Sequence, residues 1–328
     1  MKKALAAAFT AVVALTVAAC SSSTATTTST TPAPSDTQAM QTYDVRVAAL
    51  PIAETGAIWA AMDAGIFTKH GINLELVPSQ GGAYAIPALL SGDIQFAVGQ
   101  PFGTFRADQQ DLGIVIISDY ADSLASGKDV NGVVALDSSG IDGPADLAGK
   151  RVSVNSLGAA GDVTIMKAVE DAGGDPTTIQ FVEVSFPDVQ AQLEAGNIDA
   201  GWVPDPFMSR IAANGGHIVT HNYQATIPGL TVLTNITTQD NLDNKPEMVA
   251  QYEAAMEEAL DYAATHEDEV RAAIAKYLEI PPEAAAGITL PTFTSTIKRA
   301  DIEALAEMAV HFGVIDSTPN YDRILQTQ

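Results

Sequence analysis

The side chains that most often carry nucleophilic, acid–base or metal chemistry are few in this chain and widely spaced. Among the five histidines, only His217 and His221 have the four-residue spacing of a helical metal pair. They fall in a segment with the pattern of a strand, so they do not predict a zinc site. The chain also lacks a Gly-x-Ser-x-Gly elbow and a phosphate-binding loop. The sequence therefore predicts no catalytic residue, no metal site and no cofactor.

Composition narrows the classes of partner. The 328 residues include 16 Lys and Arg against 40 Asp and Glu, which gives a formal net charge of −24. Phosphate binding requires clustered basic side chains, so nucleic acid is not an expected partner. The single cysteine excludes a disulfide framework and any site built on several cysteines. The length suggests roughly two domains.

The first forty residues have the pattern of a targeting segment and a linker, not that of a folded domain. Met1–Lys3 is positively charged, and Ala4–Ala19 is an apolar run too short to span a bilayer, so we expect a signal peptide over residues 1–19. Small residues ahead of Cys20 resemble a bacterial lipoprotein signal, in which that cysteine is lipidated. The alternative is an ordinary secretory signal with an incidental cysteine. Residues 20–42 are rich in Ser and Thr and predict a disordered tether.

From Tyr43 onward, short apolar runs alternate with amphipathic segments, which is typical of α/β folds with parallel sheets and crossover helices. Two such cycles share the pattern of a helix, a C-terminal glycine and a short strand, so we expect two lobes. Lobe 1 is expected over 43–136 and 232–328, and lobe 2 over 137–231. In this division Gly132–Leu136 completes the sheet of lobe 1, and Leu230–Asn235 is expected to be a strand that returns to lobe 1. Arg151–Asn155 is expected to be a strand of the second cycle. Helices are expected over Pro246–Thr265, Asp268–Tyr277 and Asp301–Phe312. The hinge crossings are expected near Ala135–Ser138 and Tyr223–Leu233.

Several short motifs occur in an order and spacing that resemble a known family. They are the runs AAMDAGIF at 60–67, GG at 81–82, ALLSGD at 88–93, DLAGKRVSV at 146–154, QLEAGNIDA at 192–200 and DPF at 205–207. Together, behind a lipoprotein-like signal, they resemble the ABC-importer substrate-binding proteins of the nitrate/sulfonate/taurine type, which include binders of thiamine pyrimidine precursors. The resemblance covers roughly Val45–Val219.

This resemblance implies a fold and a role. The fold would be a two-lobed clamp of the periplasmic-binding-protein type (type II), each lobe a mostly parallel sheet flanked by helices. The role would be that of a monomeric substrate-binding component that catalyses nothing. It would sit on the extracytoplasmic face of a bacterial membrane, attached only by its lipid. It would capture a small organic solute and deliver it to an ABC permease with its ATPase.

The resemblance also implies where the solute is held. Ligands of α/β proteins bind beyond the carboxyl ends of parallel strands, where loops and helix N-termini meet. The residues expected to bind the ligand are Glu54, Thr55, Gly82, Ala83, Tyr84, Gln100, Pro101, Asn155, Ser156, Phe186 and Asp205.

Several of these residues have a second interpretation. Glu54 either contacts the ligand or is favoured by the dipole of the following helix, and Tyr84 and Phe186 either stack on a planar ligand or pack the core. Gln100 and Asn155 carry amides that recognise both donors and acceptors.

The charge of the ligand is suggested by the basic residues. Arg106 and Arg210 lie about a turn beyond their loops, where a surface salt bridge explains them, and no basic residue occurs in the candidate loops. A neutral or zwitterionic, aromatic ligand is therefore favoured over a small inorganic anion. Asp205 stands where the family more commonly has Glu before the proline.

Two alternatives belong to other functional classes. One is a pyrimidine-precursor-related enzyme on the same fold, which would need a reactive His or Cys at the cleft. The other is a lipoprotein that senses the ligand and passes its state to a membrane partner. Neighbouring permease and ATPase genes would separate this sensor from an importer component.

Overall fold

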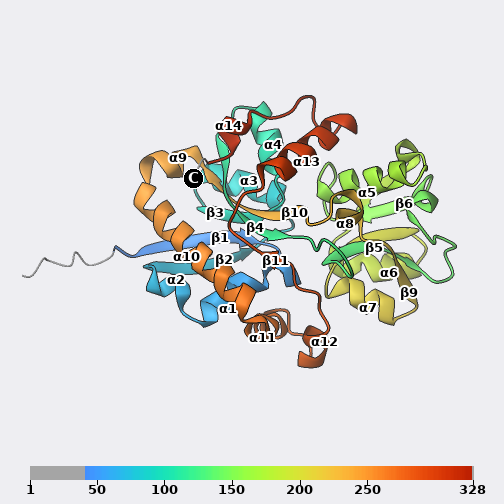
Figure 1. Cartoon of the computed structure of the whole chain (residues 1–328), viewed down its shortest axis with the longest axis horizontal. Helices are drawn as coiled ribbons and strands as arrows, with labels where there is room; N and C mark the ends of the chain where they lie inside the picture. Colours follow the sequence, from blue (N-terminus) through green and yellow to red (C-terminus); the bar gives the residue numbers. More distant parts are fainter. Residues whose placement is uncertain (1–40, 327–328) are drawn as a thin grey trace, which may run out of the picture. The chain divides into compact units, whose positions relative to one another are not determined.

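A computed structural model describes residues 41–326, in which two β-sheets are covered by helices (Figure 1). The expected signal peptide, Cys20 and nearly all of the expected tether lie outside the described residues. Among those described, no helix has both the length and the apolar character needed to cross a membrane.

The first sheet has the strand order β11-β4-β10-β3-β1-β2. Its strands are β1 (Tyr43–Ala49), β2 (Ile72–Pro78), β3 (Phe96–Gly99), β4 (Ile114–Asp122), β10 (Thr231–Thr238) and β11 (Thr292–Phe293). β1 pairs in parallel with β2 and β3, whereas β10 runs antiparallel between β3 and β4. β10 returns to the first sheet after the second sheet is complete, as the apolar run from Leu230 predicted.

The second sheet has the strand order β7-β6-β8-β5-β9. Its strands are β5 (Asn131–Leu136), β6 (Arg151–Val154), β7 (Gln180–Glu183), β8 (Ala200–Pro204) and β9 (Gly216–Thr220). β6 is parallel to β7 and β8, and β5 is antiparallel to β8 and β9.

The placement of β5 corrects one expectation. Gly132–Leu136 was expected in the sheet of the first lobe but pairs in the second sheet. A fully buried apolar strand could pack in either sheet. The hydrophobic pattern of the sequence does not determine which strands it pairs with. The first crossing therefore lies upstream of Ala135–Ser138, at 123–130, and the second lies at 221–230.

Most helices pack against the first sheet or against one another beside it. They are α1 (Gly56–Asp63), α2 (Ile66–Lys69), α3 (Gly82–Ser91), α4 (Phe102–Gln109), α9 (Gln239–Asn244), α10 (Pro246–Thr265), α11 (Glu267–Tyr277), α12 (Pro282–Ala286), α13 (Arg299–His311) and α14 (Tyr321–Ile324). On α10, Tyr252 stacks on Phe96 with ring centroids 3.7 Å apart, and its hydroxyl donates to Asn235 Oδ1 at 3.0 Å. This contact fixes α10 to the centre of the sheet.

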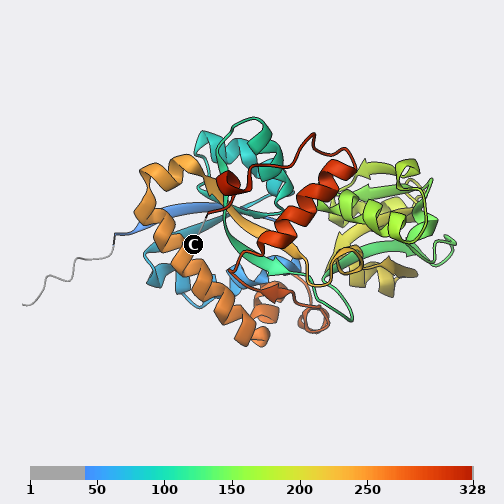
Figure 2. The same ribbon diagram turned by 45° about the horizontal axis from the view of Figure 1, so that its top comes forward.

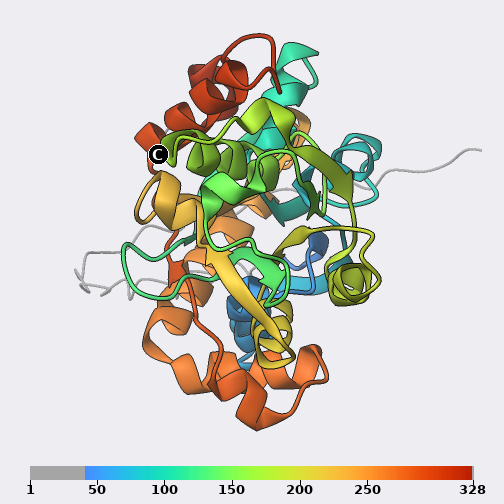
Figure 3. The ribbon, with the colours of Figure 1, turned by 90° about the vertical axis from the view of Figure 1, so that its right-hand side faces the viewer.

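The second sheet carries α5 (Ala160–Asp171), α6 (Val189–Glu194), α7 (Phe207–Ala213) and α8 (Asn222–Thr226). These elements are in front when the molecule is seen from the side of the second sheet (Figure 3). The C-terminal helix α13 also reaches this part, as Figure 2 shows, and contacts α5. At its end His311 Nε2 lies 2.9 Å from Glu170 Oε1. α13 therefore connects the helices of both sheets.

Candidate ligand-binding cleft

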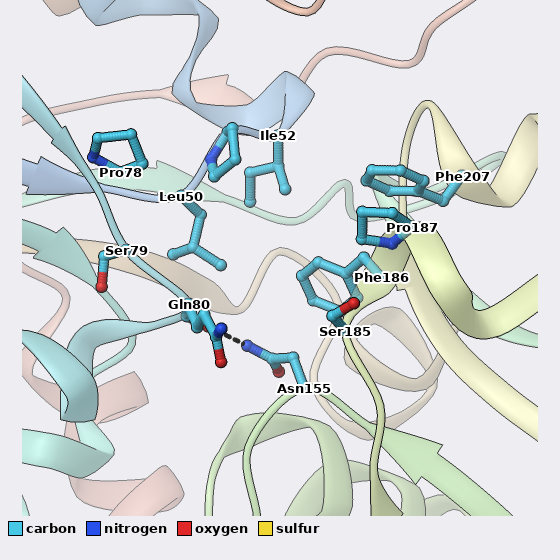
Figure 4. Close-up of a pocket in the computed structure, with 11 residues that line it drawn as sticks. Leu50, Ile52, Pro78, Ser79, Gln80, Asn155, Ser185, Phe186, Pro187 and Phe207 are labelled. Atoms are coloured by element: carbon cyan, nitrogen blue, oxygen red, sulfur yellow. Dashed lines mark hydrogen bonds between the residues drawn. The ribbon is translucent and has the colours of Figure 1, made fainter.

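A cavity of about 340 Å³ lies where loops from the two sheets face each other (Figure 4). It is called the outer cavity below. The first sheet contributes the residues that follow β1 and β2, and the second contributes those after β6, after β7 and at the start of α7. The lining consists of Leu50, Pro51, Ile52, Pro78, Ser79, Gln80, Asn155, Ser185, Phe186, Pro187 and Phe207.

The lining is apolar with a few polar groups and no charged side chain. Phe186 and Phe207 form an aromatic wall, with ring centroids 6.1 Å apart. The polar groups come from two serines, Gln80 and Asn155. Because β1, β2, β6 and β7 belong to parallel pairs, their carboxyl ends meet at this edge, where ligands of α/β folds bind.

A second, smaller cavity of about 10 Å³ continues from the outer one and has room for roughly one water molecule. It is called the inner cavity below. Leu50, Ile52 and Phe186 line both cavities. The remaining lining residues of the inner cavity are Glu54, Gln100, Asn131, Trp202, Pro204, Tyr223, Val232 and Leu233.

Hydrogen bonds join the two lobes around these cavities. Asn155 Nδ2 donates to the carbonyl of Gln80 at 2.7 Å. The amide of Gln100 accepts from Ala160 N and donates to the Tyr223 hydroxyl, both at 3.2 Å. These bonds connect the residues that follow β2 and β3 with residues of the second lobe, so the two walls of the cleft are in contact.

Glu54 is the only acidic or basic residue among the described residues that line the inner cavity. Its side chain is 2% exposed, and its Oε2 atom has no hydrogen-bond partner. Burial raises the pKa of this carboxyl well above its usual range, and the nearby Asp205 and Asp129 raise it further. The carboxyl lies on the short 3-10 turn Ala53–Thr55 that directly follows the β1 loop.

The structure brings several predicted residues together. Glu54 and Gln100 line the inner cavity, and Phe186 and Asn155 line the outer one. Gly82 and Ser156 lie in a small cavity beside them, which is lined by Gly81, Gly82, Gln100, Phe102, Gly103, Asn155, Ser156 and Ala159.

Gly82 has a steric role. A Cβ there would lie 3.0 Å from the carbonyl oxygen of Gln100. The N-terminus of α3 therefore approaches the end of β3 more closely than a side chain comfortably allows. Ala83 follows Gly82 in the first turn of the same helix.

The cavity linings do not include the predicted residues Thr55, Tyr84, Pro101 and Asp205. Thr55 donates its hydroxyl to the carbonyls of Leu50 and Ile52, which holds the β1 loop. Pro101 is buried directly before α4. Asp205 accepts a hydrogen bond from Ser209 N at 2.9 Å, in the first turns of α7. Tyr84 is 47% exposed, and its hydroxyl donates to Glu183 Oε1 at 3.4 Å.

Other aromatic and basic side chains, including Arg106 and Arg210, have structural partners. Trp59 stacks on Tyr277, with ring centroids 5.5 Å apart, away from the cleft. Arg106 donates to the carbonyl of Gly158, and burial lowers its pKa. Arg210 lies over the ring of Phe207 at 5.2 Å and donates to the carbonyl of Pro187. Neither arginine lines a cleft cavity.

Sequence reasoning missed much of the apolar lining. Leu50 directly follows a strand and continues its apolar pattern, so periodicity assigns it to the core. Trp202 and Tyr223 are core residues by the same criterion, although they line the inner cavity together with the buried polar Asn131. The available signal was proline, since Pro78 is the last residue of β2 and Pro187 follows β7, and proline marks the ends of regular elements and turns.

The described residues contain no group of three or more His, Cys, Asp or Glu side chains arranged to hold a metal ion. His217 and His221 do not face a common site. His217 Nε2 lies 2.8 Å from the carbonyl oxygen of Ile141, and His221 Nδ1 lies 2.7 Å from that of Asn131.

The chain is similar to known binding proteins. Residues 53–270 match the model of the NMT1/THI5-like family. A formylaminopyrimidine-binding protein of Halalkalibacterium halodurans is 28% identical over 167 residues, which are 51% of this chain and 48% of that protein. The matched segment thus spans about half the length of this relative.

Solved structures show the same fold. The alkanesulfonate-binding protein SsuA from Xanthomonas axonopodis pv. citri, bound to MOPS, superposes with a TM-score of 0.70 at 16% identity, over 87% of this chain and 96% of that one. The ligand-binding component of an ABC-type import system from Staphylococcus aureus, with zinc bound, gives 0.74 at 12% identity, over 86% and 96%.

These matches confirm the predicted two-lobed α/β fold and the predicted resemblance. The family model covers more than half of the chain and includes most of the cleft. The chain is thus a member of the NMT1/THI5-like family, built on the fold of the periplasmic binding proteins.

Proposed function

We propose that this protein is the extracytoplasmic substrate-binding component of an ABC importer. It captures a small organic solute in the outer cavity and delivers it to a permease that works with an ATPase. It acts as a monomer, held at the membrane by a lipid on Cys20, and it catalyses no reaction. Its relatives in sequence and fold are binding proteins, which supports this role.

One observation carries the proposal: the outer cavity takes its walls from both lobes. A solute seated there contacts loops after β1 and β2 on one side and loops after β6 and β7 on the other. It therefore binds the closed arrangement better than an open one, and its binding shifts the equilibrium toward closure. This coupling is what a permease requires if it is to recognise the loaded form.

The lining favours an aromatic or heteroaromatic solute over a sulfonate or nitrate. The aromatic wall of Phe186 and Phe207 suits a planar ring, while the amide of Asn155 and the hydroxyls of Ser79 and Ser185 supply a few hydrogen bonds. A buried sulfonate would need a basic partner, and neither lobe places one in the lining.

A thermal-shift screen tests this function. The protein is heated with taurine, alkanesulfonates, nitrate, aromatic carboxylates and aminopyrimidines. A solute present at about 100 times its Kd stabilises the folded state by about 2.7 kcal/mol. We expect hits among heteroaromatic solutes. If no small solute in any of these classes raises the midpoint, the proposed function is wrong.

Replacing Phe207 with alanine should weaken binding of any such hit about tenfold, because one aromatic contact of roughly 1.4 kcal/mol is lost. Isothermal titration measures the change. Phe181→Ala is the matched control, since Phe181 is also half-buried in the second lobe but lies outside the cavity linings. Equal affinities for Phe207→Ala and the unmodified protein would remove this wall from the site.

A further inference from the structure

We propose that the solute is an organic cation whose protonated nitrogen enters the inner cavity and pairs with Glu54. The cleft then selects amines over neutral molecules and anions of the same size. This inference rests on the proposed function, because it names the class of solute that the same cleft holds.

The first observation is the state of the Glu54 side chain. It is almost fully buried, it lines a cavity, and its Oε2 atom has no partner among the described residues. A buried polar atom without a partner costs on the order of 1–3 kcal/mol, and more for a charged group. A carboxylate kept in this position fits a site whose missing partner is a donor brought by the ligand. An ammonium group supplies such a donor together with the opposite charge.

The second observation is the charge around the cavity. Of the described residues that line the outer, inner and neighbouring small cavities, Glu54 is the only one with a charged side chain. Two more buried carboxylates, Asp129 and Asp205, interact with it unfavourably, and Asp129 Oδ2 also has no partner. This wall of the cleft is therefore electronegative, and the net charge of −24 adds to a field that attracts cations.

The third observation is the aromatic surround of the inner cavity. Phe186 packs edge-on against Trp202, with ring centroids 5.6 Å apart, and Trp202 packs edge-on against Tyr223 at 5.8 Å. All three side chains line the inner cavity with Glu54. Aromatic faces attract ammonium groups, so these rings add to the stabilisation by the carboxylate. None of the three rings carries a positive charge that could pair with an anion, and the indole Nε1 of Trp202 already donates to Asn131 Oδ1 at 3.4 Å.

The basic side chains nearest to the cleft do not neutralise its negative charge from inside the cavities. Arg210 lies over Phe207 and is committed to the carbonyl of Pro187, outside the cavity linings. Lys128 stabilises the charged form of Asp205, and His221 does the same for Asp129. Neither of these two side chains lines a cleft cavity.

Binding should be linked to pH through Glu54. A cation binds the ionised carboxyl, so affinity falls as the pH decreases below the raised pKa of Glu54 in the free protein and is level above it. The titratable groups that face Glu54 are Asp129 before β5, Asp205 after β8, Tyr120 on β4 and Tyr223 on α8. Burial raises the pKa of each of the four as well, and the two tyrosines remain neutral across this range.

Three probes of similar size and different charge test the inference by isothermal titration. They are benzylamine, benzyl alcohol and benzenesulfonate. We expect benzylamine to bind at least tenfold more tightly than the other two, because a charge pair in a desolvated site is worth more than about 1.4 kcal/mol. Its affinity should fall as the pH is lowered.

Glu54→Gln keeps the shape of the side chain and removes its charge. It should lower the affinity for benzylamine about tenfold or more, remove the pH dependence and leave binding of benzyl alcohol unchanged. Glu253→Gln is the control, because the half-buried Glu253 is also a carboxyl whose pKa burial raises, but it lies on α10 and lines no cleft cavity. An unchanged thermal midpoint shows that Glu54→Gln is folded.

The inference is overturned if benzenesulfonate binds as tightly as benzylamine, if benzylamine fails to bind at millimolar concentration, or if Glu54→Gln binds it normally. None of these results touches the proposed function as long as some solute of the larger screen binds in the cleft. If no solute binds at all, the proposed function fails first.

Discussion

Gly99→Ala is expected to destabilise the protein by about 1–3 kcal/mol, the usual cost of forcing extra atoms into a packed region. A Cβ at Gly99 would lie 2.5 Å from Gly82 Cα and 2.8 Å from Gly82 N. Both neighbours are backbone atoms, so the end of β3 and the start of α3 must move apart. Denaturant unfolding followed by circular dichroism measures the loss.

The same substitution should weaken solute binding, because Gln100 follows Gly99 and supplies the bonds to Ala160 and Tyr223 that join the lobes. Gly143→Ala is the control: no atom lies within 4 Å of a Cβ at that position, and its φ is extended. A Gly99→Ala protein as stable as the control would contradict the close approach of α3 to β3.

The folded protein is expected to be more stable near pH 5 than near pH 8. Among the described residues, burial raises the pKa of seven carboxyls, namely Glu54, Asp119, Asp122, Asp129, Asp162, Asp205 and Glu253. Each binds its proton more tightly in the folded chain than in the unfolded one. Its contribution is therefore complete below the ordinary carboxyl pKa, about 4, and is lost as the pH rises through the raised value.

Exposed carboxyls act in the opposite direction but only at lower pH. Hydrogen bonds from Thr177, Arg151 and Lys69 lower the pKa values of Asp175, Asp199 and Glu258, respectively. Their stabilising contribution is lost as the pH falls through these lowered values. The free energy of unfolding should thus pass through a maximum on the acid side of neutrality.

Asp119→Asn should reduce the loss of unfolding free energy that occurs as the pH rises from about 5 to about 8. Asp119 is 1% exposed, and its carboxyl accepts hydrogen bonds from Tyr120 N and the Thr231 hydroxyl, contacts that an amide keeps in part. Asp44→Asn is the control, because Asp44 is exposed and should leave the profile unchanged. A thermal midpoint that rises steadily from pH 5 to pH 8 would contradict this account of the buried carboxyls.

Local structure was largely predictable from the sequence. The strand expected at Arg151–Asn155 is β6, and the amphipathic runs after Pro246 form α10, α11 and α13. The period of the hydrophobic pattern and the capping residues predict such elements from the local sequence alone. The local sequence does not determine which sheet a buried strand joins, and for this reason β5 was predicted in the wrong sheet.

The candidate site was predictable mainly in its polar part, together with Phe186. Gln100 and Asn155 stand out because an amide at the end of a buried strand has no packing role to explain it. Leu50 looks like a core residue in the sequence and becomes a lining residue only because two lobes meet over it. The recess at Glu54 likewise depends on Trp202 and Tyr223, which come from distant elements.

Hydrogen exchange with and without a solute identified by the screen tests solute capture between the lobes most directly. The solute should slow exchange in both the Ser79–Gln80 loop of the first lobe and the Ser185–Pro187 loop of the second. Slower exchange in one lobe only, or only at residues outside the cleft, would contradict the claim that the two lobes hold the solute between them.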